Sequence, residues 1–173
     1  MRILGIDPGL RITGYGCVDA RGPDLSLVEA GVFKLGTGRS AGKGAASVSE
    51  RLVELDRDFR ELLDRLRPEV VGVEALFAHY KHPATAIVMG HARGVLLLAI
   101  RQAGARLLEF KPALVKNATT GHGQATKEQM QSAIQGLFGL PEPPSPPDVA
   151  DALAVAVCAA RRIALGVDAI ETA

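Results

Sequence analysis

Two acidic residues, Asp7 and Glu74, directly follow apolar stretches of the sequence, residues 2–6 and 70–73. Such stretches are typical of buried strands, and carboxylates at strand ends lie at the edge of a sheet, where ligands commonly bind. An acid whose only role is to face solvent on the surface would be out of place there. Asp7 also has a structural interpretation, as a turn residue before Pro8.

A second pair of acids, Asp148 and Asp151, lies at the start of a predicted helix, and their three-residue spacing places both on one face. Asp148 alone is explained equally well as a helix N-cap or a favourable first-turn charge. That explanation is weaker for Asp151, because an apolar run follows it at once. The structural explanations would all have to hold independently, which favours a shared function for the four acids.

Converging carboxylates without a cysteine or histidine partner indicate a site for hard cations. Mg²⁺ and Mn²⁺ prefer oxygen ligands and keep waters for substrate phosphates. Two such ions activate a water and stabilise the leaving oxygen in phosphodiester hydrolysis. We therefore expect Mg²⁺ or Mn²⁺, with two ions per active site, and the chemistry of a nuclease.

Charge is unevenly distributed along the chain, although the net charge is only +1. Between residues 76 and 127, seven cations face the single acid Glu109, so this stretch carries +6 and the remainder −5. The asymmetry favours a surface for an anion, but solvated cations scattered over separate helices explain it about as well. The cations are Lys81, Arg93, Arg101, Arg106, Lys111, Lys116 and Lys127.

Composition predicts one globular domain over residues 1–173, with a loose C-terminal tail from about residue 166. The chain is 47% apolar and 23% charged, and aromatic residues make up only 4%, which disfavours base stacking as the main mode of action. Cys17 and Cys158 lie far apart among apolar neighbours, as buried thiols of a reducing compartment do. The longest uninterrupted apolar run, residues 152–160, is far shorter than the ~18 residues of a membrane span. We expect a cytoplasmic protein without membrane association.

The elements that must position the acids are predicted from hydrophobic periodicity. Strands are expected over residues 2–6, 13–20, 25–35, 70–74 and 105–110. Helices are expected over residues 47–66, 83–103, 111–119 and 148–164, and a further helix is expected to begin at Lys127 after a Thr126 cap. The first three strands form an antiparallel meander, and the later alternation of helix and strand predicts an α/β fold with a mixed sheet and helices on its faces. Helix 83–103 is apolar on more than one side, which is typical of a central helix or of one covered by a partner chain.

The glycine-rich segment 36–44 resembles a phosphate-binding P-loop but departs from its pattern. Five residues instead of four separate Gly36 from Gly42, and Gly44 replaces the required Ser or Thr. We interpret the segment as a mobile loop. The neighbouring histidines at 79, 82 and 91 are interrupted by Pro83, which disfavours a zinc site.

Taken together and in order, the sequence blocks across residues 2–162 resemble the bacterial RuvC family of Holliday junction resolvases. The blocks are residues 3–9 (ILGIDPG) with 13–16 (TGYG), 73–77 (VEALF), 90–95 (GHARGV), 115–116 (VK) leading to 121–129 (GHGQATKEQ), and 148–156 (DVADALAVA). The first block alone is only moderately specific, because related nucleases and sugar-kinase-like ATPases begin similarly. All blocks in order are highly specific.

The resemblance implies an RNase H-like fold, with a mixed five-stranded sheet and helices on both faces, in a homodimer. It implies a metal site formed by Asp7, Glu74, Asp148 and Asp151. It also implies paired symmetric nicks in the two opposed continuous strands of a four-way junction, with 5′-phosphate and 3′-hydroxyl products, in homologous recombination and DNA repair. The family's partners RuvA and RuvB, which drive branch migration, are expected as partners here.

The resemblance also implies residues that contact DNA. Lys116 and Lys127 match positions near the DNA. Lys116 is expected to contact the scissile phosphate and is therefore counted with the catalytic residues. Phe77 matches a ring that stacks at the opened junction. Further expected contacts are Lys81, Arg93 and His122. The chain departs from the family at Cys17, where valine is more usual, and at His122, in a loop where the family varies.

Three other functions are alternatives to a junction resolvase. A related nuclease of the same fold acting on structured RNA would share the four carboxylates. A non-catalytic junction-binding scaffold would be expected to lack one of them, and none is missing. A sugar-kinase-like ATPase would need a second large domain, for which 173 residues leave no room.

Overall fold

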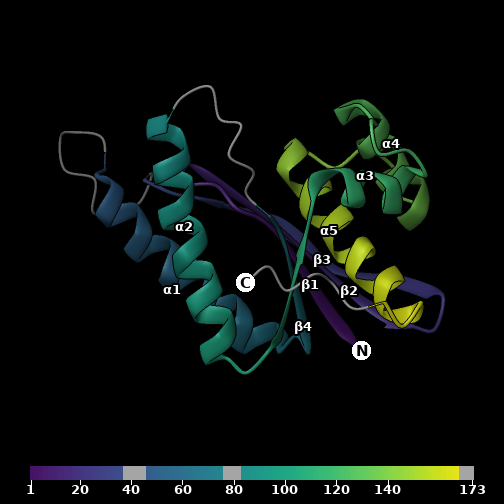
Figure 1. The fold of residues 1–173 in the computed structure, drawn as a ribbon, viewed down its shortest axis with the longest axis horizontal. Helices are drawn as coiled ribbons and strands as arrows, with labels where there is room; N and C mark the ends of the chain where they lie inside the picture. The colour runs from purple at the N-terminus through teal and green to yellow at the C-terminus, as the bar shows by residue number, and fades with distance from the viewer. Residues whose placement is uncertain (37–45, 76–82, 168–173) are drawn as a thin grey trace.

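A computed structural model describes residues 1–36, 46–75 and 83–167, and it is built on one five-stranded sheet (Figure 1). The elements in chain order are β1 (Arg2–Asp7), β2 (Ile12–Arg21), β3 (Asp24–Lys34), α1 (Val48–Leu66), β4 (Val70–Glu74), α2 (Pro83–Gln102), β5 (Arg106–Phe110), α3 (Pro112–Thr120), α4 (Lys127–Phe138) and α5 (Pro147–Ala164). Each predicted strand and helix is therefore confirmed, with ends within one residue of those expected.

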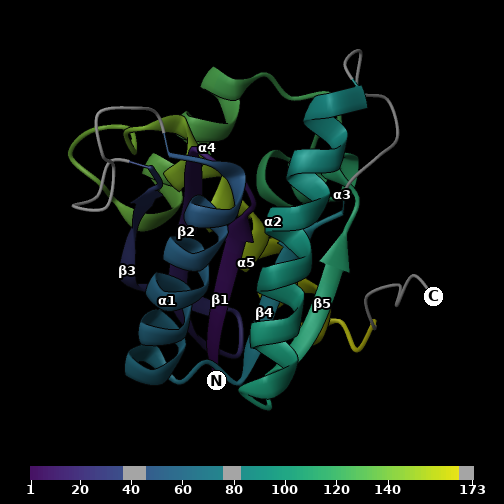
Figure 2. The ribbon, with the colours of Figure 1, turned by 90° about the vertical axis from the view of Figure 1, so that its left-hand side faces the viewer.

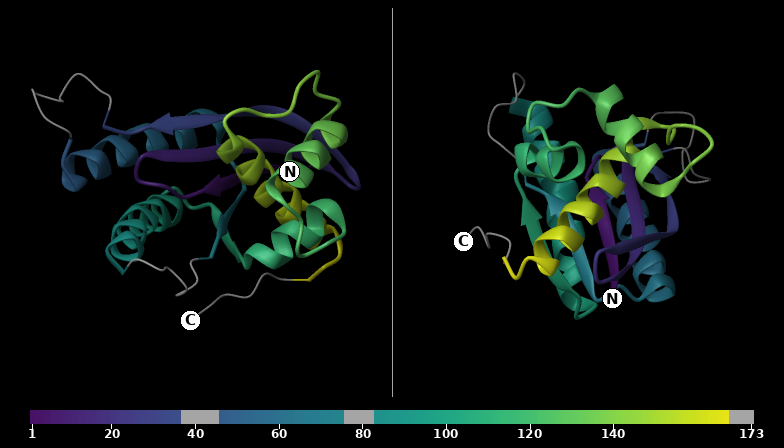
Figure 3. Two further views of the ribbon diagram at one scale, coloured as in Figure 1. Left: turned by 90° about the horizontal axis from the view of Figure 1, so that it is seen from above. Right: turned by 90° about the vertical axis from the view of Figure 1, so that its right-hand side faces the viewer.

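The sheet has the order β3-β2-β1-β4-β5 and is mixed, as predicted. β1 pairs antiparallel with β2, which pairs antiparallel with β3, whereas β1, β4 and β5 run parallel. The strand that ends in Asp7 is therefore the central one. Figures 2 and 3 show α1 and α2 covering one face of the sheet and α3, α4 and α5 the other.

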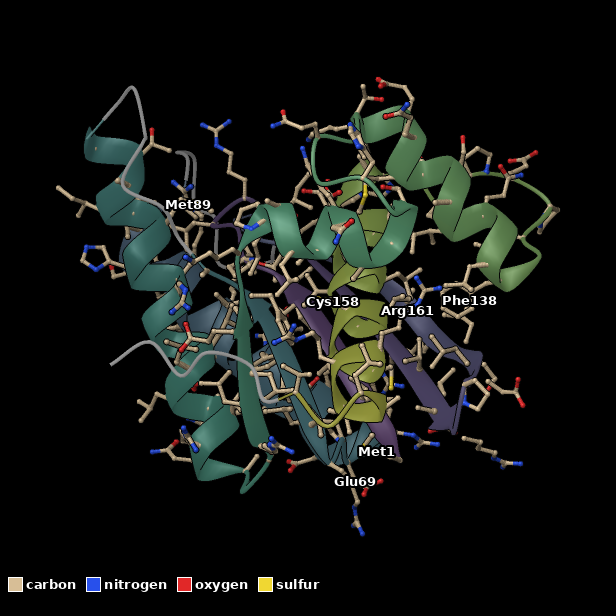
Figure 4. All side chains as sticks on the ribbon, turned by 45° about the vertical axis from the view of Figure 1, so that its right-hand side comes forward. Met1, Glu69, Met89, Phe138, Cys158 and Arg161 are labelled. Atoms are coloured by element: carbon tan, nitrogen blue, oxygen red, sulfur yellow. The ribbon has the colours of Figure 1, made fainter. Side chains whose placement is uncertain are left out.

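Each face of the sheet carries its own core because the strands alternate. On β1, Ile3 packs toward α5, while Leu4 and Ile6 pack toward α1 and α2. The two free cysteines fall on opposite sides, Cys17 toward α1 and Cys158 on α5 (labelled in Figure 4), and both are buried, as expected. The alternation decides which strand-end residues face which helices.

Helix α1 has the local signals that its boundaries require. Ser47 caps its first turn in a capping box with Glu50, which accepts a hydrogen bond from the Ser47 N–H. Arg67 ends it in the left-handed conformation, directly before Pro68. Its apolar face, including Phe59, is buried against the sheet.

Helix α2 is buried on one side only. Leu96 and Ile100 are buried, whereas Ile87 is 61% and Leu98 is 56% exposed. By length and composition, its residues Ala84–Gln102 would suffice to cross a membrane, and no other helix in the described ranges does. His91, Arg93 and Gly94 interrupt its apolar residues, so no long uninterrupted apolar run marks it in the sequence. This criterion is weak evidence for a span, because core helices meet it too.

Helix α5 lies on the sheet at backbone-contact distance. A Cβ added to Gly5 of β1 would lie 2.1 Å from the carbonyl oxygen of Ala152 and 2.5 Å from the backbone nitrogen of Ala156. A Cβ on Gly14 of β2 would lie 2.1 Å from the carbonyl oxygen of Asp148. The two glycines therefore fix the height and position of α5 above the sheet.

We expect Gly5→Ala to destabilise the protein by about 3 kcal/mol or more, because backbone atoms must separate to admit the methyl group. Gly136→Ala is the matched control, since nothing lies within 4 Å of its Cβ position on α4 and Ala is favoured over Gly there by about 0.5–1 kcal/mol. Urea denaturation followed by circular dichroism measures both. Equal stability of Gly5→Ala and the parent would contradict this account of the helix–sheet contact.

Candidate active site

Asp7 and Glu74 lie side by side at the carboxyl ends of adjacent parallel strands. Ile6 pairs with Val73 in the β1–β4 register, so the next residues on both strands are the two acids. By strand alternation Asp7 shares the α5 face with Gly5, and Glu74 shares it with Gly72. Both side chains are half-buried. The prediction that the two strand-end acids share one edge is confirmed.

Asp148 and Asp151 reach the same edge from the first turns of α5. Asp7 lies opposite Gly14 in the β1–β2 register, and the Asp148 backbone packs directly on Gly14. No side chain separates the helix from the strand at this point. The two helix acids are half-buried as well, and three elements thus bring the four predicted carboxylates together.

The electrostatics show that these carboxylates act on one another. Burial, and then the charges of Asp151, Glu74 and Asp148 in that order, raise the pKa of Asp7 from its ordinary 3.8 to about 8. Burial, then the charge of Asp151, raises the pKa of Glu74 to about 7. Burial also raises the pKa of Asp151. Such shifts are typical of functional sites, where like charges are held together against repulsion.

Two lysines partly offset this negative charge. The Lys127 ammonium lowers the pKa of Asp7, Glu74 and Asp151, and the Lys116 ammonium lowers that of Glu74 and Asp151. Both predicted basic residues therefore lie within electrostatic range of the carboxylates.

The helices that carry these lysines are fixed at their ends. Lys127 is the first residue of α4, where Thr126 and Gln129 form a capping box. Lys116 lies on α3, which is joined to α5 by a hydrogen bond from the Arg161 guanidinium to the Ala118 carbonyl (Arg161 is labelled in Figure 4). The two cations are thus held in place relative to the helix that carries Asp148 and Asp151.

His122 lies in the turn between α3 and α4 and is exposed. The backbone N–H of His122 donates a hydrogen bond to the Thr120 hydroxyl at 3.1 Å. That hydroxyl lies 3.0 Å from the His122 carbonyl oxygen and 2.9 Å from the Lys116 carbonyl oxygen. The backbone of the turn is therefore ordered by Thr120. The imidazole lies at the surface beside the lysine helices.

Arg93 is placed differently from the other expected DNA contacts. Its guanidinium forms an ion pair with Glu109 of β5, and the two side chains are only 13% and 17% exposed. Glu109 follows Leu108 on the strand and faces α2, so the pair lies across the sheet from the carboxylates. The +6 stretch is therefore not one continuous surface. Phe77 and Lys81, and nearly all of the glycine-rich segment, lie outside the described residues.

The residues at this edge suit a hard divalent cation. The donors are carboxylate oxygens, and a cation would relieve the repulsion that raises their pKa values. Among the described residues, no three His, Cys, Asp or Glu side chains already form a group that could hold a metal ion. Asp7, Glu74, Asp148 and Asp151 would therefore have to draw closer around it.

Sequence reasoning missed a residue that orders the loop after Asp7. Thr13 is fully buried. Its hydroxyl accepts a hydrogen bond from the Gly9 N–H at 3.2 Å and donates one to the Gly9 carbonyl at 2.5 Å. The loop of residues 8–11 is thereby closed onto β2. The only sequence signal was its place in the TGYG block.

Comparison with known proteins places this geometry in a family context. A family model described as crossover junction endodeoxyribonuclease RuvC matches residues 3–159. RuvC of Rhodopirellula baltica is 42% identical over 156 residues, which cover 90% of this chain and 84% of that protein. RuvC of Moorella thermoacetica is 45% identical over 158 residues, 91% of this chain and 90% of that one. The solved structure of T. thermophilus RuvC in complex with a Holliday junction substrate superposes with a TM-score of 0.86 at 35% identity and covers 98% of both chains.

We expect the stability of the protein in EDTA to fall as the pH rises from about 4 to about 8. The pKa of Asp7 is 3.8 ordinarily and about 8 when folded, so in this window the unfolded chain has lost a proton that the folded chain keeps, and ionisation favours unfolding. Asp7→Asn removes this effect and should be more stable than the parent at pH 8 by ~2–4 kcal/mol, with the difference vanishing near pH 4.

Urea denaturation at pH 4, 6 and 8 measures this difference. Added Mg²⁺ at pH 8 should stabilise the parent more than Asp7→Asn, because the variant has one ligand fewer. Asp24→Asn, at the far end of β2 and β3, is the control and should show neither effect. A variant less stable than the parent at pH 8 in EDTA would overturn the account of mutual repulsion.

Proposed function

The chain belongs to the RuvC family of crossover junction endodeoxyribonucleases, and we propose that its four-carboxylate edge is where it cuts a Holliday junction. The RNase H-like fold expected from the sequence is the fold of its structural neighbour. The proposed reaction is a pair of symmetric nicks that leave 5′-phosphate and 3′-hydroxyl ends, in recombination and DNA repair. The observation that carries the proposal is the mutual electrostatic coupling of Asp7, Glu74, Asp148 and Asp151 at one sheet edge.

These carboxylates would hold Mg²⁺ or Mn²⁺, two ions per site, with Asp7 shared between them. When bound, the cations supply activation of the attacking water and stabilisation of the leaving oxygen. Asp7 is positioned for this role on the central strand, between Glu74 on β4 and the acids of α5. The metal dependence of the family agrees with this assignment.

Lys116 and Lys127 would bring the scissile strand to the carboxylates. An acidic edge alone repels phosphates, and the two ammonium groups are the cations within electrostatic range of it in the described structure. Lys116 would orient the scissile phosphate, and Lys127 would hold the adjoining backbone. Phe77, Lys81, Arg93 and His122 stay predicted DNA contacts, and RuvA and RuvB stay predicted partners.

We expect Asp7→Asn to reduce cleavage of a synthetic four-way junction by more than about 100-fold. Loss of a group that only hydrogen-bonds to a metal ligand typically lowers activity by about 10–100-fold, and Asp7 is proposed to be a ligand itself. Junction binding in EDTA should be retained or tightened, because a negative charge is removed from a phosphate-binding edge. Labelled junctions in Mg²⁺, Mn²⁺ or EDTA measure cleavage, and a mobility-shift assay measures binding.

A linear duplex of the same sequence and a structured RNA hairpin are the control substrates. Paired, metal-dependent nicks confined to the junction support the proposal. Cleavage retained by Asp7→Asn would remove Asp7 from the active site. Preference for the hairpin would favour the RNA nuclease, and binding by the parent without cutting would favour a scaffold.

Helix α2 supports a further part of the proposal, a homodimer. Six of its exposed residues recur at alternating spacings of three and four, which is the pattern of a helix packed along another helix. This stripe consists of Ala84, Ile87, His91, Gly94, Leu98 and Arg101. Contact with a second copy would remove Ile87 and Leu98 from water.

We expect Leu98→Glu to convert a dimer into a monomer, because a charge would be buried between the two helices. Val53→Glu is the matched control, since Val53 is 70% exposed on α1 and outside the stripe. Sedimentation velocity over a range of concentrations measures the oligomeric state. An unchanged state for Leu98→Glu would exclude the α2 stripe as the interface.

A further inference from the structure

Three cations surround a cavity of about 420 Å³ beside the active site. The residues that line it include no acid and belong to the loop after β1, the facing ends of β2 and β3, and the start of α1. They are Arg11, Ile12, Lys34, Leu35, Gly36, Ala46 and Arg51. The volume is within the range of sites that bind small ligands or parts of larger ones.

Independent contacts bring the cations together. Leu35 N–H donates to the Arg11 carbonyl at 2.9 Å, which sets Arg11 beside the end of β3. Lys34 lies opposite Ile12 in the β2–β3 register. These backbone pairings place two of the three cations, and both of their side chains are exposed.

The third cation is fixed from α1. The Arg51 guanidinium donates two hydrogen bonds to the Ala46 carbonyl, at 3.1 and 2.9 Å. Its Cδ lies 3.2 Å from the position that a Cβ on Gly36 would occupy. Both hydrogen bonds engage a carbonyl and not a carboxylate. The nearby Glu54 instead accepts a hydrogen bond from the Gly36 N–H at 2.6 Å.

The cavity and the carboxylates lie on either side of one short loop. Asp7 ends β1, and Arg11 follows four residues later, in the loop that Thr13 closes onto β2. The end of β1 and the start of β2 lie at the same edge of the sheet, because Asp7 pairs with Gly14. Figure 2 shows α1 nearer β3 and α2 nearer β5, so the cavity extends this edge away from α2.

We propose that this cavity binds the sugar–phosphate backbone of a junction arm that the active site does not cut. The inference rests on the proposed function. Contacts to phosphate supply much of the affinity for nucleic acid, and arginine side chains and backbone N–H groups commonly make them. Ile12, which is 36% exposed, supplies apolar surface for the sugar. A free phosphate or nucleotide has similar chemistry, but continuity with the catalytic edge favours a strand of the same substrate.

The test compares the parent with the double variant Arg11→Ala/Lys34→Ala, in EDTA, as the salt concentration is varied. We expect junction affinity to fall by about 3- to 30-fold and the slope of log K against log salt to decrease by about 1–2. The cleavage rate at saturating protein with Mg²⁺ should be unchanged, because the carboxylates and Lys116 are untouched. Hydroxyl-radical footprinting should show loss of backbone protection within one arm.

Arg21→Ala is the matched control, an exposed cation at the opposite end of β2, and it should change neither affinity nor slope. Unchanged affinity and slope in the double variant would overturn the proposal, as would loss of inorganic phosphate binding with junction affinity intact. A parent that does not bind the junction would overturn the proposed function and this inference with it. A double variant that melts below the parent would be replaced by Arg11→Gln/Lys34→Gln, to which the same criteria apply.

Discussion

The direct backbone contact between α5 and the sheet is the constraint on which the rest of the structure depends. At Gly5 and Gly14 the strands meet helix backbone atoms with no room for a methyl group. The spacing of the two layers is therefore set by main-chain atoms, which hardly deform, and not by side chains, which repack. Asp148 and Asp151 take their positions above β1 from this contact. The apolar residues of α5, nearly all buried, supply the favourable free energy that holds like charges together.

The carboxylate edge lowers the stability of the folded protein. Asp7 and Glu74 are held where burial and neighbouring charges oppose their ionisation, an arrangement that a site without a ligand has no reason to keep. The compensating lysines come from α3 and α4, outside the sheet. Because Arg161 joins α5 to α3, Lys116 and the acids of α5 belong to one packed unit.

The sequence allowed the prediction of those features that depend on local pattern. Apolar runs that end in Asp7 and Glu74 revealed both the strands and their edge, and Thr126 revealed the start of α4. The ion pair of Arg93 with Glu109 was not predictable, because a count of charges along the chain does not say which of them face each other across elements. The roles of Gly5 and Gly14 were hidden for a similar reason, since a close approach involves a partner distant in sequence.

The carboxylates of the site come from parts of the chain that are far apart in sequence. Asp7 lies on the first strand, whereas Asp148 and Asp151 lie on the last helix, and β1 is the central strand of the sheet. Contacts of such long sequence separation form late, because the intervening loop must first be closed. A growing polypeptide on the ribosome would hold Asp7 and Glu74 long before α5 emerges to complete the set. The carboxylate edge is therefore completed only when nearly the whole domain has been synthesised.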